Sequence, residues 1–374
     1  MDVPFMDLGP MTVEVRSEVD AAWDRMLAAG DFVGGAEVER FEERWAAYCG
    51  TTEAIAVANG TDSLTLILRA LGIGPGDEVV VPANTFVATA EAVVLAGATP
   101  RFADVDPDTL LLTPDTMTAA VTPQTAAVIA VHLYGQPADM EAIGAAAGRA
   151  GLAVIEDAAQ AHGATWNGRR AGSFGVAGSF SFYPAKNLGA FGDGGAVVTS
   201  DPQLARTLRA LRDHGRPAGS HHTHIGVGTT SRLDTLQAAV LTAKLARLDD
   251  WIRARRRVVA RYEEALADSP VRMVASAAGA GPAWHLAVAL VPDRDRDRAA
   301  LAARGVRTAV HYPVPCHLLP PYRRYATGEL PVTEAAATRV LSLPLFPHLS
   351  EEQVATVCAA LREVAREAVP ADAS

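Results

Sequence analysis

The sequence has few cysteines, no excess of basic residues and no long apolar run. Its 374 residues include three cysteines, Cys49, Cys316 and Cys358, which are odd in number and far apart. This usage argues against a disulfide framework and is typical of a reducing compartment, so we expect a cytoplasmic protein. The longest uncharged stretch, 117–138, is interrupted by Thr, Pro, Gln and His, which argues against a membrane span. The first residues form neither a basic nor an apolar segment, so we expect no secretion signal.

Charge and length limit the class of protein further. The formal net charge is −10, so we do not expect a nucleic acid as partner. Small anions remain possible ligands, because helix ends bind them whatever the net charge. Hydrophobic residues make up 49% and charged residues 20%, as in an ordinary globular protein. The length is enough for two lobes. We expect a large domain over 1–250, with an N-terminal arm, and a smaller domain over 251–374.

Short apolar runs alternate with helical patterns over most of the first 215 residues. The runs are 54–58, 78–81, 126–131, 152–155, 179–183 and 196–199. The helical patterns are 37–48, 62–71, 86–96, 138–150 and 202–213. This alternation predicts an α/β fold with a mainly parallel central sheet and helices on both faces. Asp193-Gly194, between two runs, is a hairpin signal and predicts a mixed sheet.

The segments from residue 233 onward predict a long helix and a smaller α/β lobe. Residues 233–267 are rich in Leu, Ala and Arg and predict one long helix. An apolar run at 284–291, a helical pattern at 296–304 and a Pro-rich loop at 311–321 follow it. A final helix is expected from Ser350.

Two of the apolar runs lead to residues with catalytic potential. The run 152–155 leads to Asp157, and the run 179–183 leads to Lys186. Pyridoxal phosphate chemistry needs both groups, a lysine amine for the cofactor aldehyde and a carboxylate that keeps the pyridine nitrogen protonated. Burial makes such a lysine partly neutral and therefore reactive. Two isolated residues of these types are more often a structural ion pair, so the flanking sequence has to decide.

A phosphate site is predicted where the run 54–58 meets a helix. Gly60 and Thr61 form a turn at the helix start, which exposes backbone N–H groups at the positive end of the helix dipole. The same turn also suits an ordinary helix cap. Ser181, five residues before Lys186, has a hydroxyl that can reach a phosphate oxygen.

Phe86 and Gln160 are further candidates at the predicted sheet edge. Phe86 follows the run 78–81, and Gln160 follows Asp157. Open α/β sheets bind ligands at the carboxyl ends of their strands, where an aromatic ring can stack on a flat heterocycle. Core packing is the alternative for a lone phenylalanine.

Two other patterns have structural explanations. The glycine-rich segment 72–76 follows a helix instead of a strand, and Pro75 blocks the helix that a dinucleotide site needs. His221, His222 and His224 match no usual ligand spacing, so we expect a polar loop and no metal site.

Several segments resemble the DegT/DnrJ/EryC1/StrS family of sugar aminotransferases. They are 59–64, 81–89, 154–164, 179–195 and 231–241. The run FSFYPAKNLGAFGDGG at 180–195 is highly specific, and the resemblance extends from Phe32 to Pro344.

The resemblance implies fold type I of the pyridoxal phosphate enzymes and a homodimer with shared active sites. It implies that Lys186 bonds the cofactor and that Asp157 holds its pyridine nitrogen. The other implied contacts are Gly60, Thr61 and Ser181 for the phosphate, Phe86 over the ring and Gln160 on the oxygen side. A related dehydratase branch has histidine in place of the lysine, so Lys186 favours transamination.

The sequence departs from the family pattern in two places. Thr230 stands where the family has an asparagine that reaches the phosphate in the neighbouring subunit. The upstream loop reads His221-His222-Thr223-His224 in place of a Lys-Tyr pair before its histidine. Both departures concern the cross-subunit part of the expected site.

We therefore expect a pyridoxal phosphate aminotransferase that moves an amino group from an amino acid, such as L-glutamate, to a nucleoside-diphosphate keto-sugar. His311 and Tyr312 in the Pro-rich loop are candidates for sugar contacts. The alternatives are a sugar dehydratase with the same cofactor and a non-catalytic ligand-binding or regulatory protein with the same fold. The sequence leaves open whether the ketone is at C3 or C4.

Overall fold

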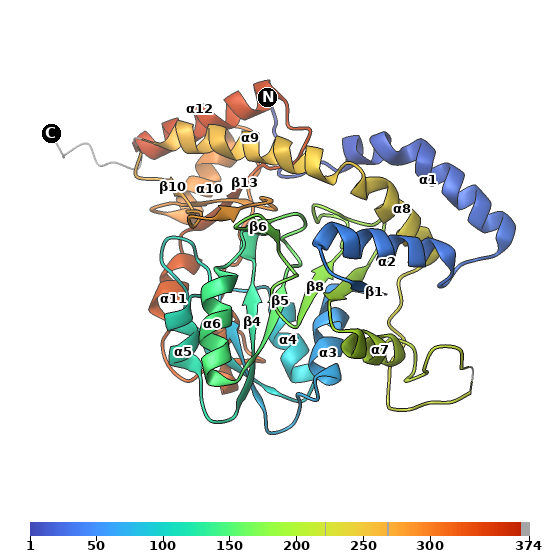
Figure 1. Ribbon diagram of the computed structural model, residues 1–374. Helices are drawn as coiled ribbons and strands as arrows, with labels where there is room; N and C mark the ends of the chain where they lie inside the picture. The colour runs from blue at the N-terminus through green and yellow to red at the C-terminus, as the bar shows by residue number, and fades with distance from the viewer. Residues whose placement is uncertain (221, 268, 368–374) are drawn as a thin grey trace.

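The computed structural model describes residues 1–220, 222–267 and 269–367, and Figure 1 shows the arrangement of its elements. The helices are α1 (Gly9–Ala29), α2 (Ala36–Cys49), α3 (Gly60–Ala70), α4 (Val87–Leu95), α5 (Pro114–Ala120), α6 (Met140–Ala150), α7 (Pro202–Leu211), α8 (Thr235–Leu245), α9 (Leu248–Leu266), α10 (Arg294–Ala303), α11 (Pro331–Ala337) and α12 (Glu351–Glu367). The strands are β1 (Glu53–Val57), β2 (Glu78–Pro82), β3 (Thr99–Ala103), β4 (Thr125–Val131), β5 (Ala153–Asp157), β6 (Thr165–Trp166), β7 (Arg169–Arg170), β8 (Ala177–Ser181), β9 (Gly195–Thr199), β10 (Arg272–Met273), β11 (Ala280–Gly281), β12 (Ala287–Leu290) and β13 (Val340–Leu343).

The central sheet has seven strands in the order β1-β9-β8-β5-β4-β2-β3. β9 pairs antiparallel with both of its neighbours, and the other adjacent pairs are parallel. β9 therefore runs opposite to the other six strands, which confirms the predicted mixed and mainly parallel sheet. The carboxyl ends of those six strands lie along one edge, which is where open α/β sheets bind ligands.

Helices cover both faces of the sheet, as predicted. Ala54 and Ala56 of β1 pack in one hydrophobic cluster with Trp45 of α2. Ile55 and Val57 pack in another cluster, with the side chains of α3. The strand serves both clusters because successive side chains point to opposite faces.

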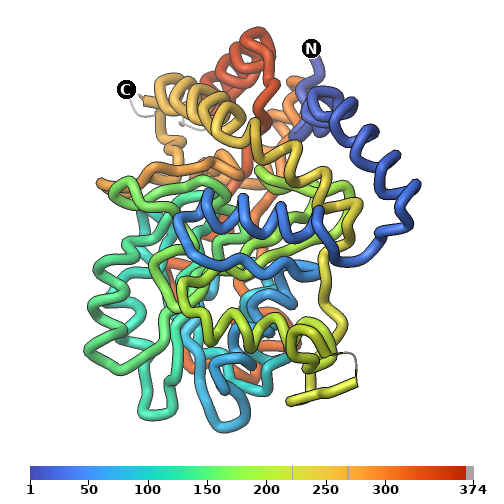
Figure 2. Tube along the Cα trace, turned by 45° about the vertical axis from the view of Figure 1, so that its right-hand side comes forward, coloured from blue at the N-terminus to red at the C-terminus, as the bar shows by residue number. Residues whose placement is uncertain are grey.

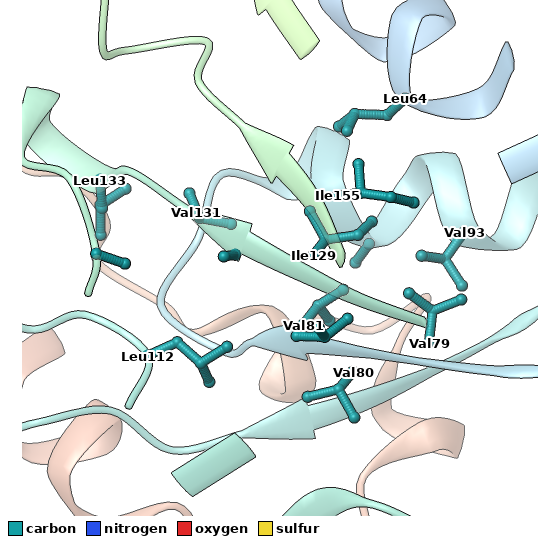
Figure 3. Packing of buried hydrophobic residues seen from close by; sticks show 14 of the residues in the cluster. Leu64, Val79, Val80, Val81, Val93, Leu112, Ile129, Val131, Leu133 and Ile155 are labelled. Atoms are coloured by element: carbon teal, nitrogen blue, oxygen red, sulfur yellow. The ribbon is translucent and has the colours of Figure 1, made fainter. Parts of the chain in front are cut away.

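The larger cluster lies beside the parallel strands. Figure 3 shows Val81 of β2, Ile129 of β4 and Ile155 of β5 in one packed group with Leu64 of α3 and Val93 of α4. These five side chains are buried, with relative exposures of 2% or less. Such packing fixes the positions at which the strands end.

The connection between β8 and β9 differs from the prediction. The two strands are antiparallel neighbours, but residues 182–194 join them, so Asp193-Gly194 ends a loop and is not a two-residue turn. The loop folds back on itself, because the Phe182 N–H donates to the Gly194 carbonyl at 2.7 Å and the Ala190 N–H donates to the Phe182 carbonyl at 2.8 Å. This loop carries Lys186 at the carboxyl edge of the sheet.

The helix predicted over 233–267 is two helices, α8 and α9. At the break, the Arg247 guanidinium donates to the Ala243 carbonyl at 2.8 Å and also pairs with Glu18 of α1. A basic side chain satisfies carbonyls at a helix end, and Asp249 and Asp250 favour the start of α9. The break lets α8 pack against α1 and α9 pack against α12.

The C-terminal segments pack around a second sheet, of order β10-β12-β13. α9 and α12 lie side by side at the top of Figure 1, and Figure 2 shows the N-terminal segment reaching the same end of the molecule. Val3 there pairs with Val306 and belongs to the hydrophobic cluster of this region. Within the described ranges, no helix is long and apolar enough to cross a membrane.

Glu156 and Asp157 end β5 but have different surroundings. The Glu156 side chain is fully buried and accepts backbone N–H groups of Gly172, Phe174 and Gly175 at 2.6–2.8 Å. It also bonds His132 Nε2 at 2.9 Å, and His132 Nδ1 accepts the Ala138 N–H, so the Nε2 atom carries the proton. Glu156 thus fastens β5 to the turn before β8 and is structural.

We predict that Glu156→Gln lowers the free energy of unfolding by about 2–4 kcal/mol. Both carboxylate oxygens of Glu156 accept hydrogen bonds, whereas a glutamine forms weaker ones through its oxygen and turns its NH₂ group toward N–H donors. Chemical denaturation measures this difference. Glu39→Gln, at an exposed position of α2, is the matched control and should change stability by less than about 0.5 kcal/mol. Equal stabilities for the two variants would contradict the structural role of Glu156.

Candidate active site

The carboxyl edge of the central sheet holds a cavity of about 420 Å³, here called the main cavity. Each of β1, β2, β4, β5 and β8 is followed by residues that line it. Nine of the residues proposed from the sequence line this cavity: Gly60, Thr61, Phe86, Asp157, Gln160, Ser181, Lys186, His311 and Tyr312. The structure therefore brings together residues that lie up to 252 positions apart in the chain.

Lys186 lies in the loop 182–194 and faces the main cavity. Burial of the amine within the protein lowers its pKa to about 8, although the Asp157 carboxylate acts in the opposite direction. Among the described residues, its amine has no hydrogen-bond partner. A partly neutral amine with free bonding capacity is a nucleophile and a base.

Asp157 is 6% exposed and is oriented by two donors. Thr89 Oγ1 donates to Asp157 Oδ2 at 2.7 Å, and the Ala159 N–H donates to Oδ1 at 3.2 Å. Thr89 gives its one proton to the carboxylate, so it accepts the hydrogen bond that joins it to Thr85 at 2.8 Å. The carboxylate is thus held as an acceptor at the cavity wall.

An anion cradle lies at the start of α3. Asn59 caps the helix by accepting the Asp62 N–H at 2.8 Å, while Gly60 and Thr61 begin the helix beside the main cavity. A Cβ atom on Gly60 would lie 2.8 Å from the Ser181 Cβ, so only glycine lets the two chains approach this closely. The helix N-terminus and the Ser181 hydroxyl together suit a phosphate group.

Phe86, Gln160 and Tyr312 form one wall of the cavity. The Phe86 ring is 49% exposed and lies 5.5 Å from the Tyr312 ring, so it is not a core residue. Gln160 Nε2 donates to the Tyr312 hydroxyl at 3.2 Å. An exposed aromatic face beside a fixed amide can receive a flat, polar ring.

Histidines also surround the cavity, and sequence reasoning found only His311 among them. Burial lowers the pKa of His311 to about 4 and that of His285 well below its usual value, and the Lys186 charge adds to both effects. His285 lines the main cavity from a segment without a motif of its own. His162 bonds the Ser181 carbonyl at 2.9 Å, and burial lowers its pKa to about 3. All three are neutral near pH 7 and can only donate or accept hydrogen bonds.

Thr230 lies elsewhere in the single chain. It lines a second cavity of about 460 Å³ that shares Asp193 with the main cavity, and its hydroxyl bonds His214 Nε2 at 2.6 Å. Its expected contact with a phosphate in the neighbouring subunit stays a prediction. In the loop before it, His221 lies outside the described residues. In the described ranges, no group of three His, Cys, Asp or Glu side chains is arranged to hold a metal ion.

A mainly parallel α/β sheet with a desolvated lysine, an oriented carboxylate and an anion cradle at its carboxyl edge defines the class, a fold type I aminotransferase. The model of the DegT/DnrJ/EryC1/StrS aminotransferase family matches residues 14–362, and the chain belongs to this family.

Named relatives agree with this assignment. The chain is 49% identical over 365 residues to dTDP-3-amino-3,4,6-trideoxy-alpha-D-glucose transaminase of Streptomyces venezuelae, covering 96% of each protein. The crystal structure of S. venezuelae DesV in complex with a ketimine intermediate superposes with a TM-score of 0.94 at 49% identity, over 97% of this chain and 98% of that one. NtdA from Bacillus subtilis with bound cofactor PMP gives a TM-score of 0.90 at 33% identity, over 98% and 85%.

The pKa of Lys186 gives a prediction that needs no bound ligand. The sequence contains two lysines, and Lys244 is 4% exposed with its amine on the Gly189 carbonyl at 2.7 Å. Acetic anhydride should label Lys186 through the cavity with a half-maximal rate near pH 8. Asp157→Asn should lower this midpoint, because the carboxylate favours the charged amine. Mass spectrometry of the two lysine peptides measures both.

Asp193→Asn is the matched control, since Asp193 lines the same cavity but is not a cause of the Lys186 shift. It should leave the midpoint unchanged. A Lys186 midpoint near 10.5, the ordinary value for a lysine, would contradict the desolvated environment.

Proposed function

We propose that this protein is a pyridoxal phosphate-dependent aminotransferase that transfers an amino group from L-glutamate to the C3 ketone of a dTDP-keto-deoxysugar. The observation that carries the proposal is the Lys186 amine, with a lowered pKa, in one cavity with the oriented Asp157 carboxylate. The cavity also combines an anion cradle with an exposed aromatic face. The rest of the proposal draws on what the relatives are named for.

The residues of the main cavity fit this cofactor. Gly60, Thr61 and Ser181 would hold its phosphate, since a side chain at Gly60 would fill the cradle and the helix start provides N–H donors. Phe86 would cover the ring, Gln160 would support the oxygen side, and Asp157 would meet the pyridine nitrogen. When bound, pyridoxal phosphate supplies an aldehyde that takes up an amine and a ring that accepts electrons.

The protein residues then have distinct tasks. Asp157 would hold the ring nitrogen of the bound cofactor, and Thr89 keeps the Asp157 side chain in place. Lys186 Nζ, which is partly neutral at physiological pH, takes the proton that leaves the α-carbon of the amino acid. His311 presents an uncharged ring, with Nδ1 engaged by Ser342 Oγ at 2.8 Å, to the sugar.

The names of the relatives support a dTDP-sugar and amination at C3. The S. venezuelae relative at 49% identity is named for a dTDP-3-amino sugar. Lys186 disfavours a dehydratase, since that branch has histidine at this position.

A panel of keto-sugars tests the proposal. The purified enzyme, L-glutamate and either a dTDP-3-keto or a dTDP-4-keto deoxysugar are combined, and the release of 2-oxoglutarate is measured. We expect release with the 3-keto sugars. Loss of water from the sugar without 2-oxoglutarate would point to a dehydratase, and no reaction with any sugar would favour a non-catalytic protein.

The two lysines of the chain make the site of cofactor attachment a sharp prediction. Borohydride reduction of the yellow protein should fix the cofactor on Lys186, because Lys244 donates to Gly189 and stacks on Phe191 at 4.6 Å outside the main cavity. Peptide mass spectrometry identifies the modified lysine. Lys186→Ala should retain no turnover, and an adduct on Lys244 would refute the assignment.

We further propose a cytoplasmic homodimer with shared active sites. Thr230 supports this, since it lines a solvent-open cavity that adjoins the main cavity at Asp193. Ile225 and Val227, in the loop before Thr230, are 70% and 84% exposed in the single chain. Apolar side chains this exposed favour a partner surface. In the dimer, Thr230 would approach the cofactor phosphate of the second copy.

If the site is shared, cofactor affinity should fall when the protein is diluted below the dissociation constant of the dimer. Thr230→Asn should hold the cofactor at least as tightly as the wild type, because the longer amide adds reach and a donor. Absorbance titration at several protein concentrations measures both effects. Thr118→Asn, at an exposed position of α5, is the control and should change nothing. A fully active monomer would contradict the shared site.

A further inference from the structure

Tyr134 has an unusual backbone for a buried aromatic residue. It lies just after β4, is 2% exposed and has φ 63° and ψ 5°. This left-handed conformation is unfavourable for a residue with a branched or bulky side chain, and it persists where surrounding contacts determine it. The adjoining Gly135 is also left-handed, and a Cβ there would lie 2.6 Å from the His285 nitrogen. The segment is therefore pressed against its neighbours.

Three residues of the main cavity are bonded to Tyr134. Its N–H donates to Gln160 Oε1 at 2.6 Å, and its carbonyl accepts the His285 N–H at 2.9 Å. Its hydroxyl donates to the His311 carbonyl at 2.7 Å. Gln160, His285 and His311 come from three separate segments, and the unusual backbone of Tyr134 aims its donors and acceptor at all of them.

These hydrogen bonds connect Gln160 on one side of the cavity with the loop of His311 and Tyr312 on the other side. Gln160, fixed by the Tyr134 N–H, donates through Nε2 to the Tyr312 hydroxyl at 3.2 Å. Tyr312 follows His311, whose carbonyl returns to the Tyr134 hydroxyl. The side proposed to meet the cofactor and the loop proposed to meet the sugar thus both contact one residue, the first through the Tyr134 backbone and the second through its hydroxyl.

We infer that Tyr134 is a positioning residue for the amino-group acceptor. The Tyr134 hydroxyl holds the His311 backbone so that the His311 imidazole meets the keto-sugar. This inference rests on the proposed function. The Tyr134 hydroxyl acts only on the acceptor side, because its backbone N–H, and not its side chain, holds Gln160. The two half-reactions should therefore respond differently to the loss of the hydroxyl.

Tyr134→Phe removes the hydroxyl and retains the ring and the backbone bonds. In the holoenzyme, KM for the active keto-sugar should rise about fivefold to tenfold, as for the loss of one hydrogen bond. The rate of 2-oxoglutarate formation from L-glutamate in a single half-turnover should change less than about twofold. Equal losses in both half-reactions, or an unchanged KM, would overturn the inference.

Tyr262→Phe is the matched control. Tyr262 is 0% exposed, and its hydroxyl donates to the Pro344 carbonyl at 2.8 Å, away from the main cavity. Both variants lose one buried Tyr-to-carbonyl bond and should unfold at similar temperatures. Only Tyr134→Phe should raise KM, so the same rise in both variants would show a general effect of stability and refute the positioning role.

A double-mutant cycle with His311→Ala tests the route of the effect. His311→Ala alone should raise KM, and adding Tyr134→Phe should raise it less than about twofold further, since the positioned ring is gone. The inference would be overturned if the two substitutions raised KM independently, so that their effects multiplied, or if His311→Ala left KM unchanged. Failure of the proposed function is distinguishable, because the wild-type enzyme would then form no product with any keto-sugar.

Discussion

The active site depends on the burial of the Lys186 ammonium group, which is taken out of water next to the Asp157 carboxylate. Burial alone would make the Lys186 amine neutral, and the Asp157 charge alone would keep it protonated. The balance of the two lowers the pKa of Lys186 to about 8, so the neutral and reactive form of the amine is a substantial minority at physiological pH. Thr89 and Ala159 hold Asp157 and thereby maintain this balance.

The sheet makes this balance possible, because it delivers each group from a different strand to one edge. Glu156 and Asp157 are neighbours in β5, and successive side chains of a strand point to opposite faces, so one can have a structural role while the other faces the cavity. One carboxylate fastens the turn before β8 through backbone N–H groups, and its neighbour faces the cavity. Behind the edge, Tyr134 connects Gln160 with the loop at His311 through a backbone that few residues adopt.

Local patterns predicted the parts of the site that lie in strand-to-loop junctions, including Gly60, Asp157 and Lys186. Most strands of the central sheet, and the helices α2, α3, α4, α6 and α7 beside it, were also predicted, because hydrophobic periodicity follows burial, whereas α5 was not. β3 was not, since its sequence Thr-Pro-Arg-Phe-Ala has no apolar run, and the α8–α9 break depends on tertiary packing that periodicity does not record. His285 and Tyr134 join the site through contacts distant in sequence, which no local pattern contains. The contact expected of Thr230 lies between two chains and stays a prediction.

The most direct test of the Lys186–Asp157 centre is the rate at which ¹⁵N passes from L-[¹⁵N]glutamate to the keto-sugar in Asp157→Asn. The neutral amide keeps the shape of the carboxylate but cannot hold a protonated ring nitrogen. We expect cofactor to remain attached to Lys186 while ¹⁵N transfer falls by roughly 100-fold or more. Transfer at a near-normal rate would show that another group does this work and would contradict the role given to Asp157.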